Sequence, residues 1–368
     1  MQEKIKKSKI LLTGGHAATT AYCVIDEIQK EHKDIEIHFI GAKTSIEGKK
    51  IKTLEQIIFP RKNVLMHSLY SGKLSRRLSI AAFFSFLRIP FGFIHALYLL
   101  IKIKPDVVLS FGGYVGLPVV FASWILQIPC ILHEQTVAVG LANKLSSFFA
   151  DKITIAREDS KLYFKEDKVV LVGNPILPKI LELSKKVKKH IKPVAYITGG
   201  SRGAHKINIA IKPIIDKLIK LNYKIIHQTG VFDFNEFDNY SKNLQNYEVY
   251  ETIDPDDLGE IYEKIDIVIG RSGANTVCEI GYLGIPSILI PIPWTRYDEQ
   301  TKNAKSLEKS GLAQVLKEDD LTPENLLNKI IFVNENWNSI VKNYKNEFEF
   351  DKNASQKIVD LIFEYIAK

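Results

Sequence analysis

The residues best suited to chemistry lie in one stretch, from Asp266 to Ala304. A glycine turn, Gly270 to Gly273, separates an apolar run from a segment with helical spacing. Because the first turn of a helix presents unpaired amides and a positive dipole end, this turn favours a bound phosphate. Glu279 lies under two turns further on, in reach of a ribose whose phosphate sits at the helix start. We therefore predict a nucleotide site, with an ordinary crossover and a surface glutamate as the alternative.

The elements around this turn follow the order strand, turn, helix, strand. The apolar run 265–269 is typical of a parallel strand buried on both faces. Ser272 is expected to N-cap a helix that ends at Gly284, and 287–290 is the next strand. The polar loop 298–303 follows, at the carboxyl end of the sheet, where open α/β sheets bind ligands.

Two other glycine turns open similar cycles. The strand 9–12 leads into Thr13-Gly14-Gly15-His16, and 195–197 leads into a glycine-rich turn before a helix expected from His205 to Leu221. Strands alternate with helices throughout, which indicates parallel sheets. We predict an α/β chain with two Rossmann-like domains facing across a cleft.

The domain boundaries follow from composition and length. A chain of 368 residues exceeds the usual size of a single core. We expect a first domain over 1–183, a Lys-rich linker over 184–192 and a second domain over 193–349. The final helix, 350–368, is expected to pack back on the first domain.

Cysteine usage and charge limit the classes of function. The three cysteines are too few and too scattered for a disulfide framework or a zinc site, and no signal peptide is visible, which fits a reducing cytoplasm. The net charge is +8, yet no nucleic-acid-binding signature is present. An anionic membrane surface or a phosphorylated substrate fits this charge as well.

The segment 73–104 combines basic residues with many phenylalanines. Pro90, Gly92 and Arg88 interrupt it, which makes it a poor transmembrane helix. It is predicted to form two amphipathic helices that bury one face in the domain core. We also expect its Phe-rich side to dock on an anionic bilayer, because it holds more large apolar residues than two core-facing stripes need.

Ten short motifs together resemble the MurG-type glycosyltransferases of peptidoglycan synthesis. They occur in the family's order and span nearly the whole chain. They are T-G-G-H (13–16), P-D-V-V-L-S-F-G-G-Y-V (105–115), H-E-Q (133–135), L-A-N-K (141–144), G-N-P (173–175), G-G-S-R-G-A-H-K-I-N (199–208), H-Q-T-G (227–230), R-S-G-A (271–274), E-I (279–280) and D-E-Q-T-K-N-A (298–304).

The resemblance implies an inverting transferase of the two-Rossmann-domain (GT-B) class. Such an enzyme moves N-acetylglucosamine from UDP-GlcNAc to the C4 hydroxyl of undecaprenyl-diphosphate-linked N-acetylmuramoyl-pentapeptide, peripherally, on the cytoplasmic face of the membrane. The family's membrane-contacting patch corresponds to 73–104. No cofactor, metal or nucleic acid is implied, and no D-x-D pair stands where a metal-dependent transferase would need one.

The resemblance also implies roles for individual residues. The acceptor side would be lined by Thr13, Gly14, Gly15, His16, Tyr114, Glu134 and Asn143. The donor would be held by Gly200, Ser201, Asn208, Ile253, Arg271, Ser272, Gly273, Ala274, Asn275, Glu279, Gln300 and Asn303. His16 is expected to be the base, since an ordinary histidine titrates near about 6.5, with Glu134 as the alternative. Helix N-termini and glycine amides would stabilise the departing UDP.

Two departures from the family pattern bear on the acceptor. The first loop lacks the family's two leading glycines, and Thr19 and Thr20 stand where a proline is usual. No arginine follows Gly173-Asn174-Pro175, so Lys179 or Arg202 would have to replace that phosphate contact. Another glycolipid acceptor is therefore one alternative function, and a non-catalytic, membrane-bound nucleotide-sugar-binding protein is another.

Overall fold

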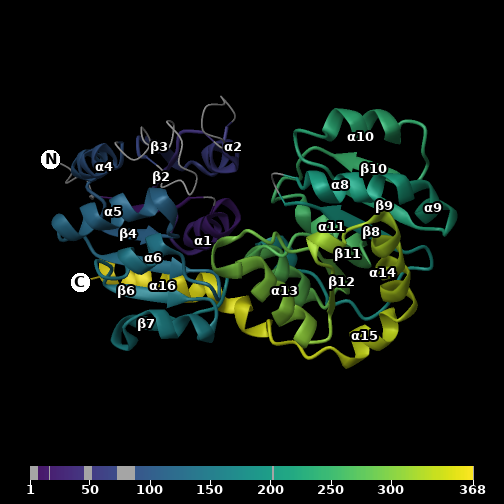
Figure 1. The fold of residues 1–368 in the computed structure, drawn as a ribbon. Helices are drawn as coiled ribbons and strands as arrows, with labels where there is room; N and C mark the ends of the chain where they lie inside the picture. Colours follow the sequence, from purple (N-terminus) through teal and green to yellow (C-terminus); the bar gives the residue numbers. More distant parts are fainter. Residues whose placement is uncertain (1–6, 16, 45–51, 73–87, 201–202, 368) are drawn as a thin grey trace. The chain divides into compact units, whose positions relative to one another are not determined.

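The computed structural model describes residues 7–15, 17–44, 52–72, 88–200 and 203–367. Within them the chain forms two compact domains, each built on a parallel sheet (Figure 1). The first comprises Met1–Pro175 and Asn353–Lys368, and the second comprises Ile176–Lys352.

The first sheet has the strand order β3-β2-β1-β4-β5-β6-β7, with every neighbouring pair parallel. Its strands are β1 Lys9–Thr13, β2 Glu36–Ala42, β3 Leu65–Leu69, β4 Val107–Ser110, β5 Cys130–Glu134, β6 Lys152–Ile155 and β7 Val169–Leu171. The helices are α1 Ala18–Glu31, α2 Leu54–Ile58, α4 Ile89–Ile103, α5 Gly113–Ile125, α6 Leu141–Ser146 and α16 Ala354–Ile366. None of the described helices is both long and apolar enough to cross a bilayer.

The second sheet has the order β10-β9-β8-β11-β12-β13, again parallel. Its strands are β8 Val194–Thr198, β9 Lys224–Gln228, β10 Tyr247–Tyr250, β11 Ile267–Gly270, β12 Ser287–Leu289 and β13 Ala313–Val315. The helices are α7 Pro178–Leu181, α8 His205–Ile211, α9 Ile215–Lys220, α10 Phe234–Ser241, α11 Leu258–Lys264, α12 Ala274–Leu283, α13 Glu299–Lys309, α14 Pro323–Glu335 and α15 Trp337–Asn343. The predicted pair of Rossmann-like domains is therefore confirmed.

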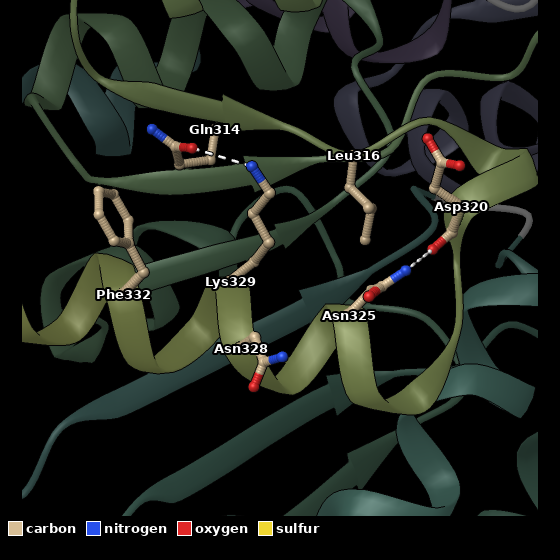
Figure 2. A pocket seen from close by; sticks show the side chains of 7 residues that line it. All are labelled: Gln314, Leu316, Asp320, Asn325, Asn328, Lys329 and Phe332. Atoms are coloured by element: carbon tan, nitrogen blue, oxygen red, sulfur yellow. Dashed lines mark hydrogen bonds between the residues drawn. The ribbon is translucent and has the colours of Figure 1, made fainter.

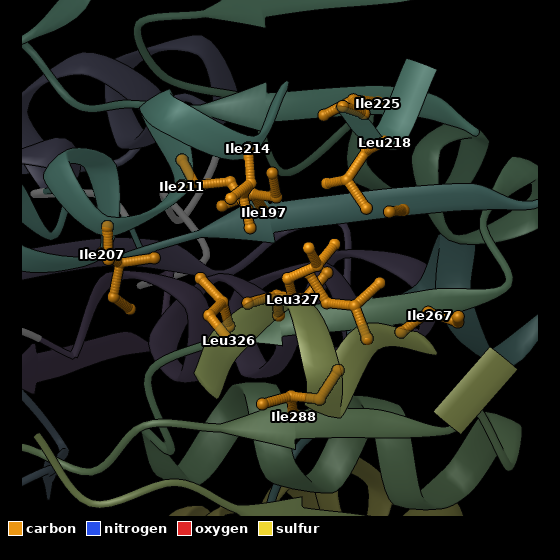
Figure 3. Close-up of a cluster of buried hydrophobic side chains, with 14 of the residues drawn as sticks. Ile197, Ile207, Ile211, Ile214, Leu218, Ile225, Ile267, Ile288, Leu326 and Leu327 are labelled. Atoms are coloured by element: carbon orange, nitrogen blue, oxygen red, sulfur yellow. The ribbon is translucent and has the colours of Figure 1, made fainter. Parts of the chain in front are cut away.

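Isoleucine and leucine side chains fill the core of the second domain between its sheet and the helices α8, α9 and α14 (Figure 3). Ile197 and Ile267 contribute to this cluster from adjacent strands, and Leu326 contributes to it from α14. The helix predicted from His205 to Leu221 is broken, because Pro213 forces a short 3-10 turn between α8 and α9.

The domain division falls earlier than the predicted end at 183, and the Lys-rich segment 184–192 is bonded into the second domain. The amide of Lys186 donates to the carbonyl of Leu283 at 2.8 Å, and His190 bonds the buried carboxylate of Asp266. At the far end of the chain, α16 packs on α1 in the first domain, where Phe363 stacks on His32.

Candidate active site

In the first domain, the loops that follow β1, β4 and β5 meet at one edge of the sheet. The strand order reverses between β1 and β4, and ligands bind open α/β sheets at such a reversal. The amide of Gly15 donates to the carbonyl of Gly112 at 3.1 Å and so ties the first two loops together. The hydroxyl of Thr13 donates inward, to the carbonyl of Ile40 at 2.9 Å.

Glu134, at the end of β5, anchors the third loop. Its Oε1 accepts from the amide of Thr136 at 3.0 Å and from the Thr136 hydroxyl at 2.9 Å, and its Oε2 accepts from Asn143 Nδ2 at 2.7 Å. Asn143 Oδ1 in turn accepts from the amide of Gly113 at 3.2 Å. Both side chains are buried, so this network fixes α5 and α6 relative to β5.

Gly112 is required by this close approach. Its φ is +78°, and a Cβ there would lie 1.8 Å from Asn143 Oδ1. The ring of Tyr114 lies beside Gly15, where an added Cβ would be 3.7 Å from it. The glycine pair after β4 therefore lets backbone, amide and ring converge at the loop edge.

In the second domain, the equivalent reversal lies between β8 and β11. Thr198 fixes the loop after β8, because its hydroxyl accepts from the Gly200 amide at 2.9 Å and donates to Gln228 at 3.0 Å. The helix α12 starts after β11, with Gly273 as its N-cap and no side-chain cap. A glycine N-cap offers these first amides no side chain of its own, and the positive end of a helix favours a bound anion.

The prediction that Ser272 caps α12 is wrong. Its hydroxyl donates instead to the carbonyl of Gln300 at 2.8 Å. Asn303 returns the contact, donating from Nδ2 to the carbonyl of Ser272 at 3.1 Å. The predicted end of the helix is confirmed, since Gly284 adopts φ +71° at the C-cap. The first turns of α13 are therefore locked onto the residue before the start of α12.

Glu279 lies on α12 and is almost fully buried. The phenol of Tyr262, on α11, donates to its Oε2 at 2.9 Å. Burial raises the pKa of Glu279 to about 7, and the bond from Tyr262 acts in the opposite direction. Its ionisation is thus poised near neutral pH.

A hollow of about 580 Å³ opens between β13 and α14 (Figure 2). Lys329 donates to Gln314 there at 3.0 Å, and Asn325 donates to the carbonyl of Asp320 at 2.9 Å. Its lining contains none of the predicted site residues. The polar groups in these two hydrogen bonds are each other's partners. This is typical of a surface hollow with a structural role.

Comparisons with known proteins agree along the whole chain. The family model described as glycosyltransferase family 28 N-terminal domain matches residues 13–155, and that of the C-terminal domain matches 194–362. A Clostridium tetani protein is 34% identical over 369 residues, which is 98% of each chain. It is named UDP-N-acetylglucosamine–N-acetylmuramyl-(pentapeptide) pyrophosphoryl-undecaprenol N-acetylglucosamine transferase. The crystal structure of Acinetobacter baumannii MurG superposes with a TM-score of 0.68 at 24% identity, covering 97% of this chain and 99% of that one.

The chain belongs to the MurG family. Its two-domain GT-B fold is shared more widely. A UDP-GlcNAc 2-epimerase from Neisseria meningitidis bound to UDP-GlcNAc has a TM-score of 0.66 at 16% identity, covering 97% of this chain and all of that one. The match in sequence, rather than in fold, is what places the chain among MurG-family transferases.

The MurG-type residues expected on the acceptor side gather in the first domain, at the loop edge described above. Thr13, Gly14, Gly15, Tyr114, Glu134 and Asn143 all lie there. His16, the expected base, lies outside the described residues. Within the part of the chain that the structure describes, no three His, Cys, Asp or Glu side chains come together as metal ligands would.

The residues expected to bind the donor differ in their burial and in the contacts of their side chains. Those from Gly273 to Asn275 lie at the start of α12, and Ile253 lies half-buried in the loop after β10. Asn208 is buried behind the loop, where its amide bonds Thr229, Asp233 and His227. The side-chain oxygen of Gln300 accepts a hydrogen bond from the amide of Ile292 at 3.0 Å. Ser201 lies outside the described residues.

Arg271 does not direct its guanidinium into open solvent. It donates from Nη1 to the carbonyl of Ile290 at 3.0 Å and pairs through Nη2 with Glu318 at 2.6 Å. Sequence reasoning missed Glu318 and Tyr262. No motif marks either residue, and only their buried contacts with predicted site residues reveal them.

Proposed function

We propose that this chain transfers N-acetylglucosamine from UDP-GlcNAc to the C4 hydroxyl of undecaprenyl-diphosphate-linked N-acetylmuramoyl-pentapeptide. The observation that carries the proposal is the 34% identity, over 98% of both chains, to a transferase of that name. Each domain has one glycine-loop edge at the reversal of its strand order, and each edge would bind one of the two substrates.

The second domain would hold the donor. The start of α12, where the positive end of the helix follows Gly273, would bind the diphosphate. Glu279 would accept from a ribose hydroxyl through the oxygen that Tyr262 leaves available. Gln300 and Asn303 would bring the start of α13 to the sugar, and the loop after β8 would lie beside the diphosphate.

The first domain would hold the acceptor and start the reaction. The C4 hydroxyl attacks the anomeric carbon of the donor sugar, its proton passes to a base, and the bond to the β-phosphate oxygen of UDP breaks. Glu134 is poorly placed as that base, since three hydrogen bonds already occupy its oxygens. His16 would therefore take the proton, and Glu134 would position Asn143 and the turn at Gly113.

The same domain would dock on the cytoplasmic face of the membrane through the exposed face of α4. Phe91, Ile94, Tyr98 and Ile101 recur along one side of this helix, with exposed fractions between 52% and 66%. Arg88 and Lys102 lie exposed at the two ends of the helix. An apolar stripe flanked by cations suits an anionic bilayer. The preceding segment, 73–87, lies outside the described residues.

Transfer of labelled sugar from UDP-GlcNAc to the lipid-linked muramoyl-pentapeptide, in detergent with a chelator present, tests the proposal. Turnover by the wild-type chain that is lost in Glu279→Ala supports it. Saturable UDP-GlcNAc binding without transfer would retain the donor and reject this acceptor. In that case the loop at 10–20, with its unusual threonines, is the first place to look for altered acceptor contacts.

A further inference from the structure

Three charged side chains from three different segments of the chain meet in the second domain. Lys206 Nζ lies 2.5 Å from Glu318 Oε1, and Arg271 Nη2 lies 2.6 Å from Glu318 Oε2. The Glu318 side chain is wholly buried, that of Arg271 is 10% exposed and that of Lys206 is 54% exposed. One buried carboxylate thus pairs with two cations.

Lys206, Arg271 and Glu318, here called the charge trio, connect segments that follow four neighbouring strands. Lys206 lies in the first turn of α8, after the glycine loop of β8, and Arg271 directly follows β11. Arg271 also donates to the carbonyl of Ile290, the residue after β12. Glu318 begins the short 3-10 turn Glu318–Asp320 that follows β13. All four segments lie at the carboxyl edge of the sheet.

A fourth side chain, that of Trp294, extends the trio to the loop before α13. The ammonium of Lys206 lies 5.2 Å from the ring centroid of Trp294, which is a cation–π distance. Trp294 is exposed and belongs to the loop that leads to Gln300. The loops that carry the proposed donor contacts are therefore joined through one carboxylate.

A buried carboxylate is costly unless it is paired, and removing it would leave Arg271 as an unpaired, nearly buried cation. Arg271 immediately precedes Ser272 and Gly273, which set the start of α12. Lys206 stands just after the glycine turn of β8. Arg271 is nearly buried and also bonded to the carbonyl of Ile290, so a shift of its guanidinium would strain the backbone beside it, whereas the more exposed Lys206 should transmit a smaller effect.

We propose that Glu318 is a positioning residue for the donor site, which sets the turn before α12 through Arg271 and the first turn of α8 through Lys206. The inference rests on the proposed donor site and adds a residue to it. Glu318 itself is too buried to touch a ligand, so it acts through the two cations.

Asp266 offers a matched control in the same domain. Its side chain is equally buried, and it accepts from His190 Nδ1 at 2.9 Å, from the His190 amide at 3.1 Å and from the Val194 amide at 2.8 Å. It precedes β11, whereas Arg271 follows that strand, so Asp266 lies at the opposite end of the sheet. Replacing either carboxylate by its amide removes one buried charge, but only one of them is near the donor loops.

The experiment compares Glu318→Gln with Asp266→Asn. Both should lower the unfolding midpoint in urea. Only Glu318→Gln should raise the dissociation constant for UDP and the KM for UDP-GlcNAc, by about tenfold, with kcat changed less than threefold. Lys206→Met should raise both constants by a smaller factor, and adding it to Glu318→Gln should give less than the product of the two effects.

Titration with UDP alone measures binding at the donor site in the absence of an acceptor. A failure of this inference can therefore be distinguished from a failure of the proposed reaction. A UDP affinity within twofold of wild type in Glu318→Gln, or an equal loss in Asp266→Asn, would overturn it. If Glu318→Gln does not fold, unchanged UDP affinity in Lys206→Met would overturn it as well. A wild-type chain that binds no UDP would overturn both proposals.

Discussion

Asn143 donates to Glu134 over 2.7 Å, and the same amide accepts from Gly113 on the neighbouring loop. The two side chains lie on different elements, α6 and β5, and both are buried. The contact therefore transmits the position of β5 to the glycine turn before α5. Together with the two bonds from Thr136 to the other oxygen, it leaves both oxygens of Glu134 occupied, which favours a positioning role over proton transfer.

Replacing Glu134 by Gln should lower kcat about tenfold, because one hydrogen bond of about 1–1.5 kcal/mol is disturbed. His16→Ala should cost about 10²–10⁴-fold, the usual share of a general base. Transfer rates for the two variants, measured across pH 5 to 9, check this. The acid limb of the pH profile should persist in Glu134→Gln and vanish in His16→Ala, and the reverse pattern would make Glu134 the base.

Donor binding should depend on pH through Glu279. Its folded pKa of about 7 lies above its ordinary value of 4.5, so the native state favours the neutral form. Its contribution to stability is therefore full below 4.5 and is lost as pH rises through about 7. The ionised form is the better acceptor for a ribose hydroxyl, so UDP affinity should rise over the upper part of this range.

Tyr262→Phe is the sharper test of the same prediction. It removes the phenol that favours the ionised carboxylate, so the midpoint for UDP binding should move to higher pH. Isothermal titration with UDP from pH 5.5 to 8.5 measures that midpoint. Glu279→Gln serves as control and should abolish the pH dependence, and a midpoint that persists there belongs to another group.

Gly273 and Gly203 should respond differently to alanine. Gly273 has φ −64°, and an added Cβ would meet no protein atom within 4 Å. Gly203 has φ +72°, and its Cβ would lie 2.1 Å from the carbonyl oxygen of Thr229. Gly273→Ala should keep wild-type stability but weaken UDP binding, because the methyl would occupy the space of a bound phosphate.

Gly203→Ala should instead lower stability, by about 1–3 kcal/mol for a strained backbone conformation. Urea unfolding and UDP titration of both variants separate the two effects. Unaltered UDP affinity in Gly273→Ala would place the diphosphate away from the start of α12.

Changing Phe91, Ile94 and Tyr98 together to Ser should release the chain from vesicles that contain phosphatidylglycerol. Partitioning should fall about tenfold or more, since each ~1.4 kcal/mol of lost burial is one factor of ten. Vesicle sedimentation measures it, and UDP binding should be unchanged. Ile209→Ser is the control, because Ile209 is 57% exposed on α8 of the other domain. Equal partitioning of the triple variant and wild type would rule out docking through α4.

Local pattern sufficed to predict the parallel strands and the glycine turns. The apolar run 265–269 and the Gly284 stop depend only on neighbouring residues, and both are found in the structure. The prediction that Ser272 caps α12 was wrong because its hydroxyl donates to the carbonyl of Gln300, which lies on another element. Glu318 could not be predicted, since its buried partners come from distant parts of the chain.

The return of α16 to the first domain also sets the order in which the two domains can complete their folding during synthesis. The chain leaves that domain after Pro175 and re-enters it at Asn353, so the second domain is an uninterrupted segment between two parts of the first. Ile358 and Ile362 of α16 are fully buried, and their surface on the first domain stays uncovered until α16 has left the ribosome. The second domain should thus complete its folding before the first, the reverse of the usual N-to-C order.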